Sequence, residues 1–289
     1  MNNIMALDIE TGRQRPTDRD GDEIPSYLDM DADGDGTMTV SAATTQSGAI
    51  GSASLDLGVL NVNAATTFAV AHAKDINISA ATDFAADVFA DTIDLTGATT
   101  TLTMGDKLTT ATGVSSVVTM NATGQKVILD GADIIAGQIT AATDGFGTEQ
   151  ITADNDADNT GTIGTSTTLK VGTLDVDKDA DFSGDLFVDT IQIDDAEVLS
   201  IIGDDQTITA AIDGDGAVEG NIIVNSGSGA TKIATFTGNL GATAELKLLT
   251  LTTEATFEGS VKVDNIDLAA ATAAVFKSDL TLAKILSGL

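Results

Sequence analysis

The sequence contains no cysteine and no tryptophan, and its 289 residues include only one tyrosine, one histidine and two prolines. Without cysteine the chain can form neither a disulfide nor a catalytic thiolate. With His72 as the only imidazole, a Ser-His-Asp triad would depend on one residue, and zinc would lack its usual ligands. Sugar-cleaving enzymes generally present aromatic platforms, which Tyr27 alone cannot supply. These absences argue against an enzyme.

Basic residues are also scarce, since 13 Lys and Arg face 44 Asp and Glu and the formal net charge is −31. So acidic a chain cannot neutralise phosphates, which excludes unaided binding of nucleic acid and disfavours anionic bilayers. No run approaches the ~18 apolar residues of a membrane span, so we expect no membrane insertion. The charge favours hydration, repulsion between unassembled copies and capture of multivalent cations. Adaptation to high salt would also produce it.

What the chain has in abundance is Ala, Thr, Val, Ile, Leu, Gly and Asp, while aromatic residues make up only 3%. From about Thr39 onward, short runs alternate apolar and polar residues, as in Leu55–Leu57, Ile93–Leu95 and Leu174–Val176. Alternation of this kind between Gly, Asn and Asp is typical of half-buried strands. The pattern predicts an all-β chain in which His72 lies on a strand face, with residues 269–277 as a short helix or another strand.

Three segments share one pattern: residues 76–95, 174–193 and 249–268. Counted from its first residue, each has apolar residues at offsets 0, 2, 12, 14, 17 and 19, Phe at 8, a small residue at 10 and Asp at 15. Neighbouring phenylalanines follow one another after 16, 21 or 19 residues, at Phe68–Phe84, Phe236–Phe257 and Phe257–Phe276 respectively. Units of 16–21 residues predict a parallel β-solenoid; the alternative is two antiparallel β-sandwich domains.

Residues 18–36 read DRDGDEIPSYLDMDADGDG and place aspartates at alternate positions around glycines. Calcium prefers six to eight hard oxygen ligands, which alternating carboxylates on a tight loop can provide. In a first set, Asp29 closes the loop and the Ile24 carbonyl contributes; a second set begins at Asp31 and has no closing acid, because Ala42 takes that place. The candidate ligands of calcium are Asp18, Asp20, Asp22, Ile24, Asp29, Asp31, Asp33 and Asp35.

This run resembles the bacterial form of the thrombospondin type 3 repeat, in which aspartates wrap calcium ions and the chain has little regular secondary structure. The resemblance covers about 20 of the 289 residues and implies calcium ligation by the seven aspartates between Asp18 and Asp35. It also implies packing roles for Ile24, Pro25, Tyr27 and Leu28. The sequence departs from the family at Glu23 and Ser26. A more general, compositional resemblance of the A-T-F-x-G phrases is to phage fibres and microbial adhesins.

Two other acidic runs, residues 153–159 and 213–216, have the Gly and Asn content of turns. Most simply they are solvated turns. A second calcium site at Asp154, Asp156 and Asp158 is the alternative reading of the first run.

The sequence predicts three regions: an N-terminal assembly strand with the calcium-binding segment (1–38), a repetitive β domain (39–268) and a C-terminal strand or cap (269–289). Apolar residues alternate near both ends, at Ile4–Ile9 and Leu280–Ile285, and could pair with the sheet edges of other copies. We therefore expect a non-catalytic, self-assembling structural subunit of an extracellular filament, sheath or surface layer. The alternatives are a phage or virion fibre, and a monomeric cell-surface adhesin segment that binds a glycan or protein ligand.

Overall fold

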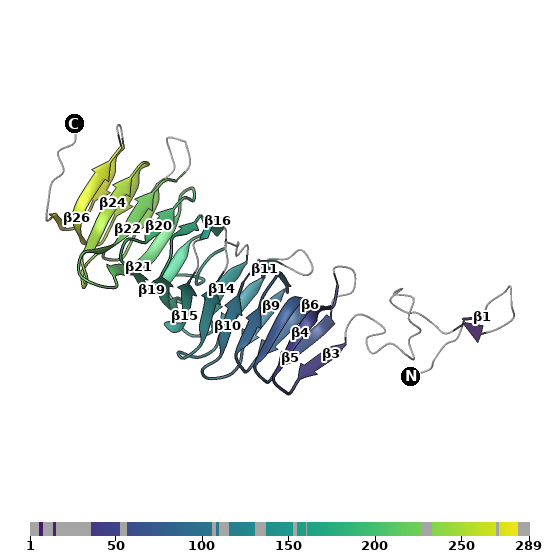
Figure 1. Cartoon of the computed structure of the whole chain (residues 1–289). Helices are drawn as coiled ribbons and strands as arrows, with labels where there is room; N and C mark the ends of the chain where they lie inside the picture. Colours follow the sequence, from purple (N-terminus) through teal and green to yellow (C-terminus); the bar gives the residue numbers. More distant parts are fainter. Residues whose placement is uncertain are drawn as a thin grey trace.

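The computed structural model describes the residues 6–7, 14–15, 36–52, 57–105, 108–109, 116–130, 137–152, 155–159, 161–226, 233–269 and 272–282. In this part of the chain the fold is all-β with no helix, and parallel strands form a β-solenoid of about 10 turns. Figure 1 shows the strands of successive coils side by side along an elongated stack, from β3 to β26. The solenoid prediction is confirmed, and the antiparallel-sandwich alternative is wrong because the pairing along the stack is parallel.

Most strands are short because each crosses one face of the solenoid before the chain turns. Outside the stack, β1 (Ala6–Leu7) pairs antiparallel with β2 (Gln14–Arg15). The solenoid strands are β3 (Thr37–Val40), β4 (Thr44–Ile50), β5 (Leu57–Val62), β6 (Thr66–Ile78), β7 (Thr82–Phe84), β8 (Val88–Phe89), β9 (Thr92–Leu95), β10 (Thr101–Met104), β11 (Leu108–Thr109), β12 (Val117–Met120), β13 (Lys126–Leu129), β14 (Gln138–Ala141), β15 (Phe146–Ile151), β16 (Asn155–Asn159), β17 (Val171–Val176), β18 (Ala180–Phe182), β19 (Leu186–Ile193), β20 (Val198–Ile201), β21 (Thr207–Gly214), β22 (Glu219–Val224), β23 (Ala234–Phe236), β24 (Leu246–Leu251), β25 (Ala255–Phe257), β26 (Val261–Leu268), β27 (Ala274–Phe276) and β28 (Leu280–Leu282).

The strand register divides the solenoid into three faces. Face A is the ladder of paired residues Met38, Leu60, Ile76, Ile93, Val118, Ile139, Ile163, Leu186, Ile208, Phe236, Phe257 and Phe276. Face B is the ladder Thr44, Thr66, Thr82, Leu102, Val127, Glu149, Leu174, Ile191, Ile212, Leu240, Val261 and Leu280. Face C holds β8, β11, β16, β18, β20, β22 and β24. On face A, successive members are 16 (60 to 76) to 28 (208 to 236) residues apart, so coil lengths range more widely than the phenylalanine spacing indicates.

The 20-residue sequence pattern is one minimal coil plus the strand that begins the next. Its offsets 0 and 17 are stacked partners in all three copies: Ile76 with Ile93, Leu174 with Ile191, and Leu249 with Ile266. The copies begin on faces A, B and C respectively. A coil of 17 residues therefore has three nearly equivalent faces, and the pattern recurs where a coil has this length.

The core is a set of columns built from the inward residue of each alternating pair. Phe236, Phe257 and Phe276 stack along face A, with ring centroids 4.9 and 5.0 Å apart, and Phe68 stacks on Phe84 at 5.3 Å on face B. These separations match the spacing of hydrogen-bonded strands. Residues 274–276, which the sequence leaves as helix or strand, form β27 and continue the face A ladder.

Buried glutamine side chains clamp two of the corners between faces. The Gln125 amide donates to the Leu95 carbonyl at 2.7 Å, while its oxygen accepts from the Ala122 amide at 3.0 Å. Gln206 repeats the arrangement, donating to the Gly184 carbonyl and accepting from the Gly203 amide. Each clamp pairs backbone groups that the turn removes from the ladders, which allows these groups to be buried at the corner.

Candidate functional site

The candidate calcium ligands between Asp18 and Asp35 lie outside the described residues, so their geometry stays a prediction. Asp154 of the second acidic run is also outside them, and of Asp156 and Asp158 only the backbone is described, as part of β16. Among residues with described side chains, no group of three or more His, Asp or Glu could hold a metal ion.

The last described coil exposes an apolar edge. Leu268 is 50% exposed and Leu280 is 41% exposed, although their ladder partners one coil further in, Leu251 and Val261, are buried. Phe276 and Leu282 are half-buried. Within the described residues, no strand pairs with the outer side of β27 or β28. This edge, defined by Leu268, Phe276, Leu280 and Leu282, is called the C-terminal edge below.

At the other end of the described stack, β3 and β4 form a second edge whose outer side pairs with no described strand. Its inward residues Met38, Thr44, Gln46 and Ile50 are half-buried, whereas their partners one coil further in are buried. We call this the N-terminal edge. Because both edges belong to the same three-faced stack, each has the strand direction and coil shape needed to continue the other.

A column of carboxylates runs along one corner of the middle coils. The backbone amides of Asp177, Asp194 and Asp215 donate to the carbonyls of Ile151, Val176 and Ile193 in the preceding coils, at 3.0–3.1 Å. Stacking therefore brings three acids, far apart in sequence, to the same corner. Asp175, on the adjoining strand, belongs to the same acidic surface.

Burial and neighbouring negative charges weaken the acidity of two of these acids, Asp175 and Asp194. Partial burial, the charge of Asp177 and, to a smaller degree, that of Asp194 raise the pKa of Asp175 to about 6, against the lowering effect of Lys126. The pKa of Asp194 is also raised, by desolvation and by Asp177, Asp215 and two glutamates. The carboxylates of the column repel one another, and bound protons or dissolved cations can reduce this repulsion.

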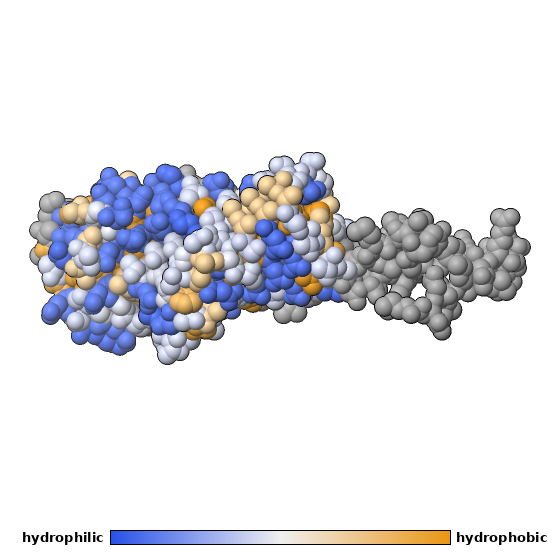
Figure 2. Space-filling model, turned by 90° about the horizontal axis from the view of Figure 1, so that it is seen from below, coloured by the Kyte–Doolittle hydropathy of each residue, from blue (hydrophilic) through white to orange (hydrophobic). Residues whose placement is uncertain are grey.

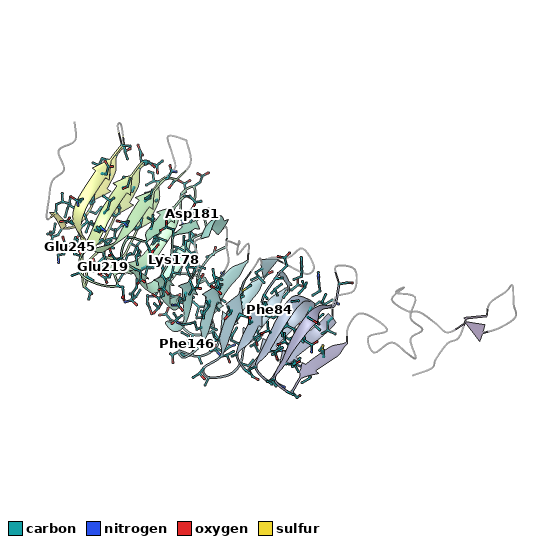
Figure 3. All side chains as sticks on the ribbon, in the orientation of Figure 1. Phe84, Phe146, Lys178, Asp181, Glu219 and Glu245 are labelled. Atoms are coloured by element: carbon teal, nitrogen blue, oxygen red, sulfur yellow. The ribbon has the colours of Figure 1, made fainter. Side chains whose placement is uncertain are left out.

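Later coils carry further glutamates on their surface, balanced in part by lysines. Glu219 and Glu245 lie along one side of these coils (Figure 3), where β22 pairs with β24. Glu245 is 3.5 Å from the Lys262 ammonium, and Lys178 is 3.1 Å from Glu197. These ion pairs link neighbouring coils but are solvent-exposed, so each contributes little to stability.

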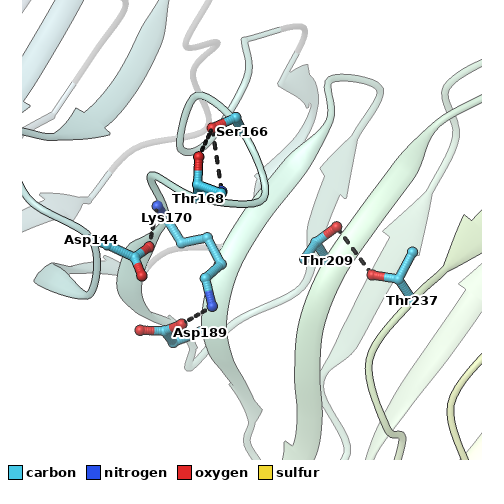
Figure 4. A network of polar contacts seen from close by, with 7 residues as sticks. All are labelled: Asp144, Ser166, Thr168, Lys170, Asp189, Thr209 and Thr237. Atoms are coloured by element: carbon cyan, nitrogen blue, oxygen red, sulfur yellow. Dashed lines mark hydrogen bonds and ion pairs between the residues drawn. The ribbon is translucent and has the colours of Figure 1, made fainter.

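Figure 4 shows a polar network at the middle of the solenoid. The Lys170 ammonium pairs with the Asp189 carboxylate, and the Lys170 amide donates to Asp144 at 2.8 Å. Ser166 and Thr168 close their turn through their hydroxyls, 3.2 Å apart, and on face A the Thr237 hydroxyl donates to that of Thr209 at 3.1 Å. All these contacts cross between coils or close turns, which is a structural role.

One shallow groove, of about 280 Å³, lies on face B near the N-terminal edge. It is lined by threonines and alanines and by a single carboxylate, Asp83. His72 lies nearby in sequence on β6, as expected, and its ring stacks on Phe89 with centroids 4.1 Å apart. The imidazole is 8% exposed, so it packs as part of the strand face.

In the view of Figure 2, polar residues dominate the described part of the chain and apolar residues form only small patches. None of the described residues belongs to a helix that is long and apolar enough to cross a membrane.

Comparison of the chain with known protein families, curated proteins and solved structures found no match in any of the three.

Proposed function

We propose that this chain is a non-catalytic structural subunit of an extracellular filament, sheath or surface layer, stabilised by calcium and assembled by strand pairing between copies. The observation that carries the proposal is the open stack. Strand edges and apolar side chains at both ends of the described solenoid have no partner strand in the described chain. Exposed sheet edges of this kind can pair with a strand of another chain unless they are protected.

In the proposed junction, the C-terminal edge of one copy meets the N-terminal edge of the next. Face A would continue from Phe276 to Met38, and face B from Leu280 to Thr44, preserving the parallel direction of every ladder. Because the two surfaces differ, the contact is head-to-tail and leads to open-ended growth. The new strand pairs would also bury Leu268 and Leu280.

The high negative charge of the chain gives bound calcium a role in assembly. Copies with a net charge of −31 repel one another, and the aspartates between Asp18 and Asp35 precede the first solenoid strand directly. Ions bound there would lower the repulsion and stiffen the segment beside the junction. This part of the proposal is supported by the sequence motif.

The structure also favours a single-chain subunit over a fibre that needs three intertwined chains. The inward columns of faces A, B and C close around one core within a single chain, and the interior residues are buried without a second copy. A phage or virion fibre and a monomeric adhesin with a glycan ligand remain the alternative functions.

A test of the junction uses Leu280→Lys and Leu268→Lys in the full chain, with Val218→Lys as the matched control. Val218 is 40% exposed, close to the value for Leu280, but it lies on the side of the stack. We expect the unchanged chain and the control to form long polymers in millimolar calcium, and both edge variants to stay monomeric with an unchanged circular-dichroism spectrum. Measurements are analytical ultracentrifugation and electron microscopy.

The two alternative functions predict other masses for the protein in solution. A fixed trimer would support the fibre, and a monomer for the unchanged chain would support the adhesin. Polymers formed equally well by the edge variants would show that the C-terminal edge is not the junction.

A further inference from the structure

Glu149 occupies a core position whose neighbours above and below in the column are apolar. It is the sixth of the twelve residues on the face B ladder, preceded by Leu102 and Val127 and followed by Leu174 and Ile191. Those four neighbours are fully buried, and so is Glu149, at 0% exposure. The middle of the rod therefore contains one carboxyl group in an aliphatic column.

This carboxyl group has no hydrogen-bond partner. Both of its oxygens are buried and unpaired. A charge in such a place is strongly disfavoured unless it is paired, so the group is held in its neutral form. Desolvation accordingly raises the pKa of Glu149 to about 8.

Neighbouring charged groups face away from it. On β13 the only charged residue is Lys126, which pairs with Thr148 and binds the Gln150 side chain at 2.8 Å, on the outward side. On β17 it is Asp175, paired with Gln150 and outward as well. β14 and the rest of β15 carry no charged residue, and the side chains of Asp156 and Asp158 on β16 are outside the described set.

The coil that holds Glu149 also has interrupted backbone pairing on two of its faces. On face A it is joined by the isolated bridges of Ile163 to Ile139 and Leu186, where the other coils have strand pairing. On face C, β16 pairs with β18 through a shifted register. Gly145, Gly147 and Gly164 all adopt positive φ, of 77, 76 and 75°. Two of the three ladders are thus weakened at the level of the buried carboxyl.

We infer that this coil is a built-in opening point of the rod, at which ionisation of Glu149 with rising pH separates the coils of β13 and β17. In a solenoid each coil contacts only its neighbours, so opening at one level need not unfold the rest. Hydration of the ionised carboxylate, which is denied in the closed core, drives the opening.

The direction of the pH effect follows from the two protonation states. In the closed rod the carboxyl keeps its proton up to about pH 8, whereas in the open coil it ionises near its ordinary value of 4.5. Opening therefore releases a proton between these pH values. The opening equilibrium rises about tenfold for each pH unit in this window and is constant again above it.

Hydrogen exchange of the full chain tests the inference, at pH 6 and at pH 8.5, with Glu149→Gln and Glu149→Leu beside the unchanged protein. Each variant is compared with the unchanged protein at the same pH, which cancels the intrinsic pH dependence of exchange. We expect β15 amides of the unchanged chain to lose about a hundredfold protection relative to Glu149→Gln between the two values. Protection of β24 should not differ among the proteins.

Glu258→Gln is the matched control, because Glu258 is a surface acid paired with Lys277 at 2.8 Å on a distant coil. It should leave β15 protection unchanged. If Glu149→Leu does not fold because the core cannot accommodate leucine, Glu149→Gln still tests the inference. Glutamine does not titrate and has nearly the same shape as glutamate. Equal pH response of β15 in the unchanged chain and in Glu149→Gln would overturn the inference, as would a carboxyl carbon resonance of Glu149 that titrates near 4.5.

Discussion

A side chain in this solenoid has its most important neighbours above and below it, in the coils before and after its own. Phe257 lies between Phe236 and Phe276, which are 21 and 19 residues away in the chain, but its ring centroid is within 5.0 Å of theirs. Glu149 shows the converse, because the same stacking surrounds one carboxyl with leucine and valine. The inward position determines the environment, whatever residue occupies it.

Replacing Phe257 with alanine should therefore remove two ring contacts and leave a cavity in a column that cannot collapse. We expect a loss of about 3–5 kcal/mol in the free energy of unfolding. Phe187→Ala is the control: Phe187 lies outward on β19 and is only partly buried, so its loss should be well below that of Phe257. Urea denaturation followed by circular dichroism measures both. Equal losses would contradict the assignment of inward and outward positions.

At the corners between strands, the close approach of successive coils limits the size of the side chain that a turn can hold. A Cβ atom added at Gly238 would lie 1.8 Å from the Ala210 carbonyl oxygen in the coil below. At Gly48 in β4, by contrast, it would meet no atom within 4 Å. The same residue type is thus required at one corner and dispensable on one strand.

Alanine substitution at these two positions gives a matched pair. Gly238→Ala should force the corner apart and destabilise the fold by at least about 2 kcal/mol, in the range of overpacking. Gly48→Ala should be neutral or slightly stabilising, because alanine restricts the unfolded chain. Thermal unfolding followed by circular dichroism compares them. A melting temperature for Gly238→Ala equal to that of the unchanged chain would show that the coils tolerate wider spacing there.

The whole molecule combines a neutral interior with a surface of very high negative charge. The columns on faces A, B and C hold the core together, while carboxylates such as Asp177, Asp194 and Asp215 stack along its outside. Association of such rods must overcome repulsion, which dissolved salt screens over about 10 Å at ~0.1 M. Bound cations act more strongly because they neutralise specific groups.

Removal of calcium should consequently act on assembly. With a chelator we expect polymers of the unchanged chain to dissociate and the melting temperature to fall, and added calcium to restore both. The double variant Asp31→Asn and Asp33→Asn should need a higher calcium concentration, whereas Asp264→Asn, an acid on β26, should not. Light scattering across a calcium titration measures this. Polymer and melting temperature that are indifferent to chelator would contradict the role of calcium.

Much of the architecture follows from the local pattern of apolar and polar residues in the sequence. Alternation in pairs such as Leu174–Val176 determines which residues point inward, and the spacing of Phe236, Phe257 and Phe276 predicts stacking coils, both of which the structure confirms. The inward place of Glu149 is also readable, from its position two residues before Ile151. The calcium ligands and the assembly remain predictions.

Stacking across the fold decided the rest, because vertical neighbours depend on the summed length of every coil and corner. For this reason the three segments that share the 20-residue pattern begin on different faces. Their identical spacing in the sequence does not reveal this difference. The same register joins Asp177 with Asp194 and Asp215, stacks His72 on Phe89, and leaves Glu149 without a partner. Local alternation fixes which way a side chain points, but only the packed coils determine what it meets.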